Sequence, residues 1–378
     1  MTPSSLQPLL DAHRVLLCVG SGGVGKTTVT AALGLAAAQR GKRVLCLTID
    51  PARRLANSLG LERMTSDATR VEPQHFERHG LDVKGSLTVM MLDTKRTFDE
   101  LVIRHASSPA ARDRILENKL YQYVSTNLAG TQEYMAMEKL LSVKADAEFD
   151  LIVLDTPPTS NALDFLDAPE RLLAALDSGA MRWLIQSVES SGRFSLNLVA
   201  KSVAVVLKGI GRLTGGGFLE QMAGFVSDLN DLFGGFRQRA EQTAAAFRGD
   251  EFAYIMVTTP APAAIREALY FAERLEASGM RRDAIVVNRV NRPPPPRPTL
   301  SDVRAAMQAH SLSLGAGGGE RLLAALDDER ARADVDAKNL EILAAQSEAG
   351  VVRVDVPALP SDVHDLGTLA GISALLCP

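Results

Sequence analysis

The sequence predicts an α/β fold: a mostly parallel, doubly wound sheet interrupted by an all-helical segment. Three observations support this prediction. Short apolar runs alternate with helical patterns at both ends of the chain, and a glycine-rich turn joins the first run to the first helix. From Asn161 to about Arg248 the residue pattern predicts helices only. Strands that alternate with helices are typical of parallel sheets covered by helices on both faces.

The composition indicates a cytoplasmic protein. The chain has 378 residues, 46% of them hydrophobic, and a formal net charge of −4. It has no basic block with interleaved aromatic residues, so no nucleic acid partner is expected. Six histidines and three cysteines are too scattered for a metal framework. Residues 1–13 lack a signal-peptide pattern, and no run is long enough to span a membrane.

The first strand, 14–19, leads into a segment that fits G-x-x-x-x-G-K-[ST], and the following helix, 28–40, stops at Gly41. The motif predicts the phosphate loop of a P-loop NTPase, in which backbone N–H groups and a helix N-terminus surround the phosphates. An accidental glycine-rich turn would lack the strand and the helix on either side. The loop residues are Gly20, Ser21, Gly22, Gly23, Val24, Gly25, Lys26, Thr27 and Thr28.

Two side chains of this motif have expected roles. Lys26 would reach the β- and γ-phosphates, and the Thr27 hydroxyl would coordinate Mg²⁺. The motif therefore predicts a nucleotide-binding protein.

Two of the next three strands lead to an acidic residue that is a candidate for the site. The second strand, 43–49, is followed by Asp50 and Pro51, which is also an ordinary helix N-cap and first-turn pair. Residues 61–85 are polar and irregular, and 87–92 is the third strand, with helices following to about 143. The fourth strand, 149–155, ends at Asp155, which is predicted to reach the Mg²⁺ shell.

The helical segment carries two apolar stripes separated by the glycine run 215–217. Such stripes are usually helix faces packed on one another, and the alternative is a groove that receives an apolar partner helix. The stripes consist of Val199, Val203, Val206, Ile210 and Leu213, then of Phe218, Met222, Phe225, Leu229, Leu232 and Phe236.

The alternating pattern then resumes. Strands are expected at 252–257, 284–287 and 351–355, and helices at 263–278, from about 319 to 346, and at the C-terminal end. The four prolines 293–296 predict a stiff extended linker. The organisation is thus one P-loop domain, 1–378, with a nucleotide-binding core at 1–165 and 250–378 and a helical insertion at about 170–248.

Taken in order, these motifs resemble the ArsA-like family of arsenite-pump and tail-anchored-protein-targeting ATPases, within the deviant Walker A class. The resemblance covers nearly the whole chain. MinD and ParA ATPases of the same class lack the long helical insertion. The segments that carry the resemblance to the ArsA-like family are 20–28, 48–55, 130–133, 155–161, 287–288 and 356–360.

The resemblance implies ATP and Mg²⁺ as cofactors and assigns roles to several residues. Asp50 would position the attacking water, and Asp155 would hold a Mg²⁺-bound water. Asn288 would read the adenine edge, while the loop that contains Pro357 and Leu359 would wall the base. Two related subunits would meet face to face, and the helical insertion would face a protein or membrane-protein client.

One departure from the family concerns catalysis. The signature lysine of the family, which reaches the partner subunit's phosphates, is Ser21 in this chain. Arg53 or Arg54 could replace it, although arginines early in a helix are usually just solvated. A related subunit of a heterodimer could also supply the lysine, in place of a homodimer.

Other departures concern metals. The zinc-binding Cys-x-x-Cys pair and the arsenite-binding cysteines of the family are absent, so neither zinc nor arsenite stimulation is expected. Asn161 stands where the family often has His, and Asn is a good helix N-cap. His75 and His79 do not form H-E-x-x-H, so a surface pair is expected.

The sequence therefore predicts a Mg²⁺-dependent ATPase whose ATP cycle switches the conformation of a dimer. Two alternatives stay open. One is a targeting chaperone for apolar helices, and the other is a regulatory ATP-binding subunit that complements a catalytic sibling. MinD-like membrane partitioning is disfavoured, because residues 367–378 form no basic amphipathic tail.

Overall fold

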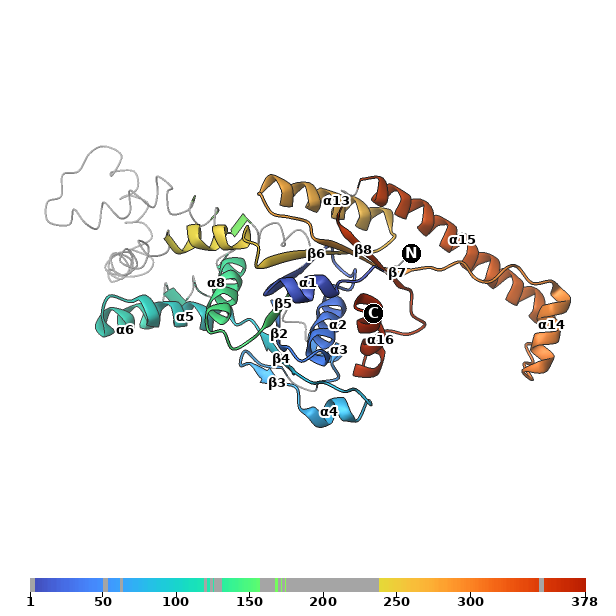
Figure 1. Ribbon diagram of the computed structural model, residues 1–378, viewed down its shortest axis with the longest axis horizontal. Coiled ribbons are helices and arrows are strands. Elements are labelled where there is room, and N and C mark those ends of the chain that lie inside the picture. Colours follow the sequence, from blue (N-terminus) through green and yellow to red (C-terminus); the bar gives the residue numbers. More distant parts are fainter. Residues whose placement is uncertain are drawn as a thin grey trace, which may run out of the picture. The chain divides into compact units, whose positions relative to one another are not determined.

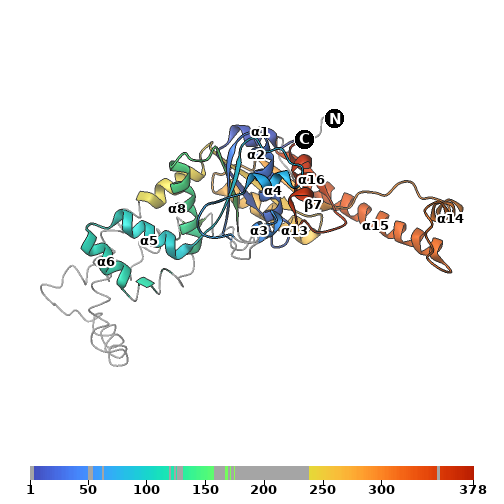
Figure 2. The same cartoon turned by 90° about the horizontal axis from the view of Figure 1, so that it is seen from below.

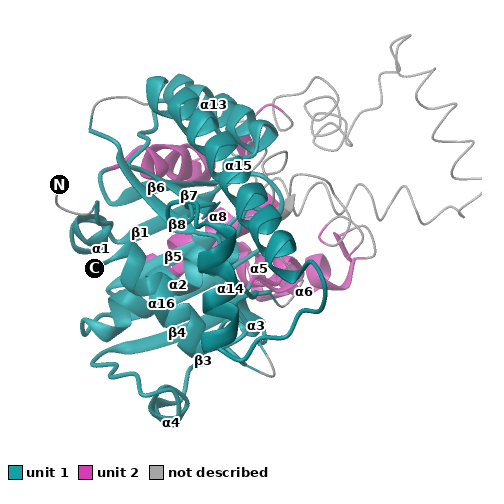
Figure 3. Ribbon diagram, turned by 90° about the vertical axis from the view of Figure 1, so that its right-hand side faces the viewer, with its two compact units in different colours: residues 1–91, 148–162, 250–378 teal, residues 92–147, 163–249 magenta. Residues whose placement is uncertain are grey.

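The structure is a computed structural model that describes residues 4–49, 54–61, 64–118, 121–122, 125, 131–156, 167–168, 171, 174, 238–346 and 350–378. The chain divides into two compact units (Figure 3). Unit 1 consists of residues 1–91, 148–162 and 250–378, and unit 2 of residues 92–147 and 163–249. Unit 2 thus includes a segment, 92–147, that lies before the predicted helical insertion. The boundaries of that insertion stay a prediction.

In the described residues, unit 1 is built on an eight-stranded sheet of order β3-β4-β2-β5-β1-β6-β7-β8 (Figure 1). All neighbouring strands are parallel except β3 and β4. This confirms the predicted mostly parallel α/β sheet. The strands are β1 Val15–Val19, β2 Arg43–Thr48, β3 Thr69–Arg70, β4 Ser86–Met91, β5 Leu151–Asp155, β6 Phe252–Thr258, β7 Ala284–Val290 and β8 Val352–Pro357.

Helices cover both faces of this sheet. On one face, α2 (Lys26–Gln39) lies over the central strands and α16 (Leu366–Leu376) packs against it. The alanines of α2 leave room for the leucines of α16, and both belong to one apolar core with α1 (Gln7–Ala12). On the other face lie α13 (Pro262–Ala277) and the C-terminal part of α15 (Gly318–Ala345) (Figure 1). The sheet is therefore doubly wound.

The proline linker 293–296 and the helix α14 (Leu300–Ala309) precede α15 in the chain. Arg330 donates to the Pro295 carbonyl (2.7 Å), and Arg297 pairs with Asp327 (2.7 Å), so the proline linker runs along α15. The helix α14 lies beside the first turns of α15 (Figure 2). Thr299 and Asp302 form a capping box at the start of α14.

Unit 2, where described, is helical. It contains α5 (Thr94–His105), α6 (Pro109–Glu117), α8 (Thr131–Ala145) and helical residues at 238–247. Asp93 caps α5 by accepting from Arg96 N (2.9 Å). Lys139 on α8 pairs with Glu100 on α5 (2.8 Å).

The structure adds elements that the sequence pattern did not predict. Residues 61–85 contain the short helix α4 (Pro73–Glu77) and the two-residue strand β3, and α1 and α14 were not predicted either. The short helix α3 (Arg54–Ser58) is described, while Asp50 and Pro51, the predicted N-cap and first-turn pair, lie outside the described residues. The two apolar stripes and the glycine run between them lie outside the described residues.

Candidate nucleotide-binding site

The phosphate loop lies between β1 and α2, in the middle of the unit 1 sheet. Its backbone requires glycine at two places. A Cβ at Gly20 would lie 2.1 Å from the Val257 carbonyl oxygen of β6, and a Cβ at Gly25 would lie 2.2 Å from Asn288 Nδ2. Gly25 also has φ +98° and is the N-cap of α2. The loop is therefore shaped by close contacts with two other strands as well as by its own glycines.

Lys26 lies folded back on this loop. Its ammonium donates to the Gly20 carbonyl (2.9 Å) and to the Ser21 carbonyl (2.9 Å), and the residue is buried. The loop thus encloses a charged group next to the N-terminus of α2, where the helix dipole favours an anion. This is the environment that a bound phosphate needs.

Thr27 and Asp155, the two residues that the sequence assigns to a Mg²⁺ site, lie together. The Thr27 hydroxyl donates to Asp155 Oδ2 over 2.8 Å. Asp155 is buried at the end of β5, beside β1 and β2. A hydroxyl and a carboxylate are the hard oxygen ligands that Mg²⁺ prefers, so this pair fits the cation.

Two further threonines hold the site, and neither is among the predicted site residues. Thr48 is paired with Asp155 in the register of β2 and β5, and its hydroxyl donates to the same Oδ2 over 3.1 Å. The Thr156 hydroxyl donates to the Cys18 carbonyl (2.8 Å), which fastens the segment after β5 to β1. A polar residue at the end of an apolar strand was the signal for Thr48.

The predicted base-binding residues come from the neighbouring strands β7 and β8. Asn288 Nδ2 donates to the Val24 carbonyl in the phosphate loop (2.9 Å). Pro357 pairs with Val290 in the register of β7 and β8, and Ala358 N donates to the Val290 carbonyl (2.9 Å). Leu359 is 40% exposed. The structure thus brings Asn288 to the loop and places 357–359 beside the end of β7.

Several predicted residues lie outside the described part of the chain. Asp50, the predicted catalytic carboxylate, is one of them, and Arg53 and Asn161 are others. Arg54 is described and is exposed at the start of α3.

The cysteines and the histidine pair have structural roles. All three cysteines are free and buried. Burial raises the pKa of the Cys18 thiol to about 12 and that of Cys46 further still, so both stay protonated inside the core. His75 Nε2 hydrogen-bonds to the Leu59 carbonyl (2.9 Å), and its ring meets that of His79 edge to face.

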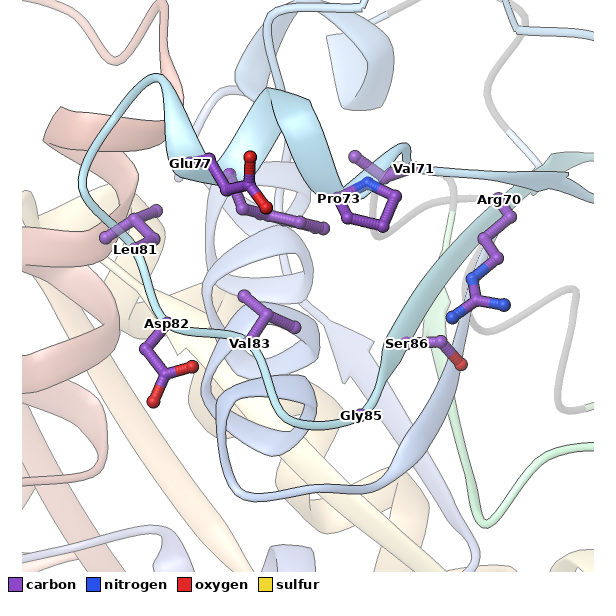
Figure 4. A pocket seen from close by; sticks show the side chains of 10 residues that line it. Arg70, Val71, Pro73, Glu77, Leu81, Asp82, Val83, Gly85 and Ser86 are labelled. Atoms are coloured by element: carbon purple, nitrogen blue, oxygen red, sulfur yellow. The ribbon is translucent and has the colours of Figure 1, made fainter.

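A small cavity of about 120 Å³ lies at the opposite edge of the sheet, near the start of β4 (Figure 4). Glu77 and Asp82 lie around it, with Arg70 on the far side (Figure 4). Since the phosphate loop follows the C-terminal end of β1, this cavity is separate from the candidate site.

A family model for anion-transporting ATPases, the ArsA ATPases, matches residues 13–311. This range contains the phosphate loop, Asp155 and Asn288. The chain belongs to this family. Its resemblance to ArsA-like ATPases, which the motifs indicated, is confirmed.

Individual relatives are distant. The chain is similar to ATPase GET3 of Malassezia globosa, with 24% identity over 298 residues that cover 78% of each chain. ATPase GET3 of Mycosarcoma maydis is 28% identical over 174 residues, which cover 46% of this chain and 48% of the relative. An uncharacterised protein of Streptomyces coelicolor is 34% identical over 164 residues, covering 43% and 39%. The last two matches span less than half of the relatives' own length.

Among the helices that the structure describes, none is both long and apolar enough to cross a membrane.

Proposed function

We propose that this chain is a Mg²⁺-dependent ATP-binding protein and ATPase. ATP binding and hydrolysis would switch the conformation of a dimer that handles a client or a membrane protein. The observation that carries the proposal is the bond between Thr27 and Asp155 beside the loop-bound ammonium of Lys26. It supports the proposal because two oxygen groups that suit a Mg²⁺ site and one ammonium group that suits phosphates meet at a helix N-terminus.

Thr27 and Asp155 are the residues that hold Mg²⁺ in this proposal, Asp155 through a water molecule. Mg²⁺ supplies charge neutralisation at the phosphates. Thr48 keeps the Asp155 carboxylate in place by donating to the same oxygen. When ATP binds, the Lys26 ammonium gives up its hydrogen bonds to the Gly20 and Ser21 carbonyls. It then donates to the β- and γ-phosphates instead.

The base side and the hydrolytic side of the site use other elements. Asn288 reads the adenine edge, and the loop with Pro357 and Leu359 walls the base. Asp50 orients the attacking water, which is the task of a carboxylate at the end of β2 in this arrangement. These roles are supported by the family membership and by the hydrogen bond from Asn288 at the end of β7 to Val24 in the loop.

The dimer is the part of the proposal that Ser21 affects most. A charge that crosses a subunit interface to the phosphates can change the rate by about 10³ to 10⁵. Because this chain has Ser21 at the position of that lysine, a regulatory ATP-binding subunit in a heterodimer is the second candidate function. The client-facing role of residues 170–248 belongs to the proposal in both cases.

Steady-state Mg²⁺-ATPase activity of the purified chain, beside Asp50→Asn, tests the proposal. Light scattering would report the mass with ADP and with a non-hydrolysable ATP analogue. We expect turnover that Asp50→Asn abolishes while ATP binding is kept, and a doubled mass with the analogue. ATP binding without turnover favours the regulatory subunit, and an absence of both binding and turnover contradicts both functions.

A further inference from the structure

The Asn288 side chain joins β7 to the phosphate loop. Its Nδ2 donates to the Val24 carbonyl (2.9 Å), although the two residues are 264 positions apart in the chain. In the sheet, β6 lies between β7 and β1. Asn288 therefore reaches past the end of β6 to the loop that follows β1.

The loop is shaped to receive this amide. Gly25, next to Val24, leaves the space for it, since any Cβ there would lie 2.2 Å from Nδ2. Val24 itself is buried. Asn288 Nδ2 thus lies close to both residues of the Val24–Gly25 peptide.

Peptide planarity gives this bond a consequence for phosphate binding. The Val24 carbonyl and the Gly25 N–H belong to one trans peptide, in which the two groups point in opposite directions. Holding the carbonyl toward Asn288 therefore turns the Gly25 N–H away from Asn288. Gly25 directly precedes Lys26, so this N–H is among the donors of the phosphate loop.

A strand irregularity aims the Asn288 side chain. The register of β7 and β8 shifts between Val287 and Val290, and Arg289 has a positive φ of 59°. Asn288 Oδ1 accepts from Arg289 N (3.0 Å), which fixes the amide group inside this bulge. Bulges of this kind re-aim side chains near functional sites.

We infer that Asn288 is a positioning residue for the phosphates as well as a reader of the base. It orients the Val24–Gly25 peptide before any nucleotide binds. The Asn288 amide group has two N–H donors and an oxygen that can accept twice. The bond to the Val24 carbonyl uses one donor, and the bond from Arg289 N uses one acceptor position. One donor and one acceptor position therefore remain for an adenine edge. The inference rests on the proposed ATP-binding function and deepens it, because one side chain links base recognition to the phosphate loop.

The test compares binding of ATP and of inorganic tripolyphosphate, which has no base, by titration calorimetry in Mg²⁺. Asn288→Asp keeps the side-chain shape but turns the donor toward Val24 into an acceptor. We expect both affinities to fall about tenfold or more, because a buried carbonyl loses its donor. Asn339→Asp makes the same chemical change on α15 and should alter neither affinity.

Hydrogen exchange of the nucleotide-free protein gives a second readout. In Asn288→Asp the amides of residues 20–26 should exchange faster than in the wild-type chain, with exchange in β4 unchanged. Asn288→Ala gives the same comparison if Asn288→Asp does not fold. Loss of ATP affinity with unchanged tripolyphosphate affinity and unchanged loop exchange would overturn the inference. A wild-type chain that binds neither compound would instead overturn the proposed function.

Discussion

The proposed cation site depends on the side chains of Thr27 and Asp155. The Thr27 hydroxyl lies 2.8 Å from Asp155 Oδ2, and Thr48 shares this oxygen. We predict that Thr27→Val, which keeps the side-chain shape, raises the Mg²⁺ concentration for half-maximal ATP binding about tenfold or more, since one hard ligand is lost. ATP binding measured across a Mg²⁺ series tests this.

Thr30→Val is the matched control for Thr27→Val. Thr30 lies in the same helix, one turn further on, and its backbone oxygen faces Cys46 Sγ (3.7 Å). It should leave the Mg²⁺ requirement unchanged. An equal effect of the two substitutions would assign the loss to α2 as a whole and contradict the ligand role of Thr27.

Ser21 limits the rate of hydrolysis in the proposed function. We predict that Ser21→Lys raises kcat about tenfold or more and changes ATP affinity little, because an added cation acts on charge that develops in the transition state. Steady-state kinetics and ATP titrations of both chains measure this. A Ser21→Lys chain with the wild-type kcat would show that the absence of a lysine at this position does not limit the rate.

At the residue scale, the sequence could predict what is local. Residues 20–28 carry their chemistry in consecutive positions, so a motif identifies them. Thr48 is marked only as a polar residue at the end of an apolar strand, because its role comes from the register of β2 and β5, which places it opposite Asp155. The hydrogen bond from Asn288 to Val24 could not be predicted either, since it depends on the order of β1, β6 and β7 in the sheet.

The helix α2 packs closely against the sheet. A Cβ at Gly34 would lie 2.4 Å from Cys46 Sγ and 3.1 Å from Leu87 Cδ1. We predict that Gly34→Ala lowers the free energy of unfolding by about 1–3 kcal/mol through overpacking. Chemical denaturation measures this loss, and Cys46→Ala in the same chain should restore part of it by removing the sulfur.

Gly371→Ala is the control for Gly34→Ala. Gly371 lies inside α16, and nothing lies within 4 Å of its added Cβ. Alanine is the better helix former by about 1 kcal/mol, so this change should not destabilise the protein. If Gly34→Ala were as stable as the wild type, the close contact between α2 and β2 would be wrong.

The beginnings of β2 and β5 are joined by a charged pair. Asp150 accepts from Arg43 N (2.8 Å) and from its guanidinium Nη2 (2.7 Å). These bonds lower the pKa of Asp150 from 3.8 to about 2. A lowered carboxyl pKa stabilises the fold at pH values above the unfolded pKa and stops doing so as pH falls through the folded pKa.

We therefore predict that Asp150→Asn destabilises the protein slightly at pH 7, because the pair is partly exposed to solvent. The difference from the wild type should shrink as pH falls from about 4 to about 2. Urea denaturation at several pH values tests this. In an Arg43→Gln background the same substitution should cost less, whereas a cost independent of pH and of Arg43 would contradict the pair.

At the element scale, prediction succeeded where a strand is continuous and apolar. The predicted strand 252–257 and helix 263–278 lie within one residue of β6 and α13 at each end. The two-residue β3 carries no periodicity, and it exists because Thr69 and Arg70 pair with β4. Proline content marked 293–296 as a linker, but the capping box that starts α14 at Thr299 was missed.

The fold includes residues that follow the end of the family match. The match ends at residue 311, yet β8 and α16 follow it. β8 adds the last strand beside β7, and α16 buries Leu369 and Ile372 in the core that includes α2. Residues after 311 are thus part of the unit that carries the phosphate loop.

The division into two units could not be predicted from the helical pattern alone. Residues 92–147 are helical like many segments of α/β folds, and only their contacts assign them to unit 2. Lys139, for example, pairs with Glu100 inside that unit. Helical periodicity does not distinguish a helix that covers a sheet from one that packs on other helices.

The central claim is that the loop around Lys26 binds ATP with Mg²⁺, and calorimetric titration of ATP into the purified chain tests it most directly. We predict saturable binding of one ATP per chain that depends on Mg²⁺ and weakens about tenfold or more in Lys26→Ala, since a charged hydrogen-bond donor is lost. Lys84→Ala, which removes an exposed lysine before β4, should bind like the wild type. Equal ATP binding by the wild type and Lys26→Ala, or no binding by the wild type, would contradict the account.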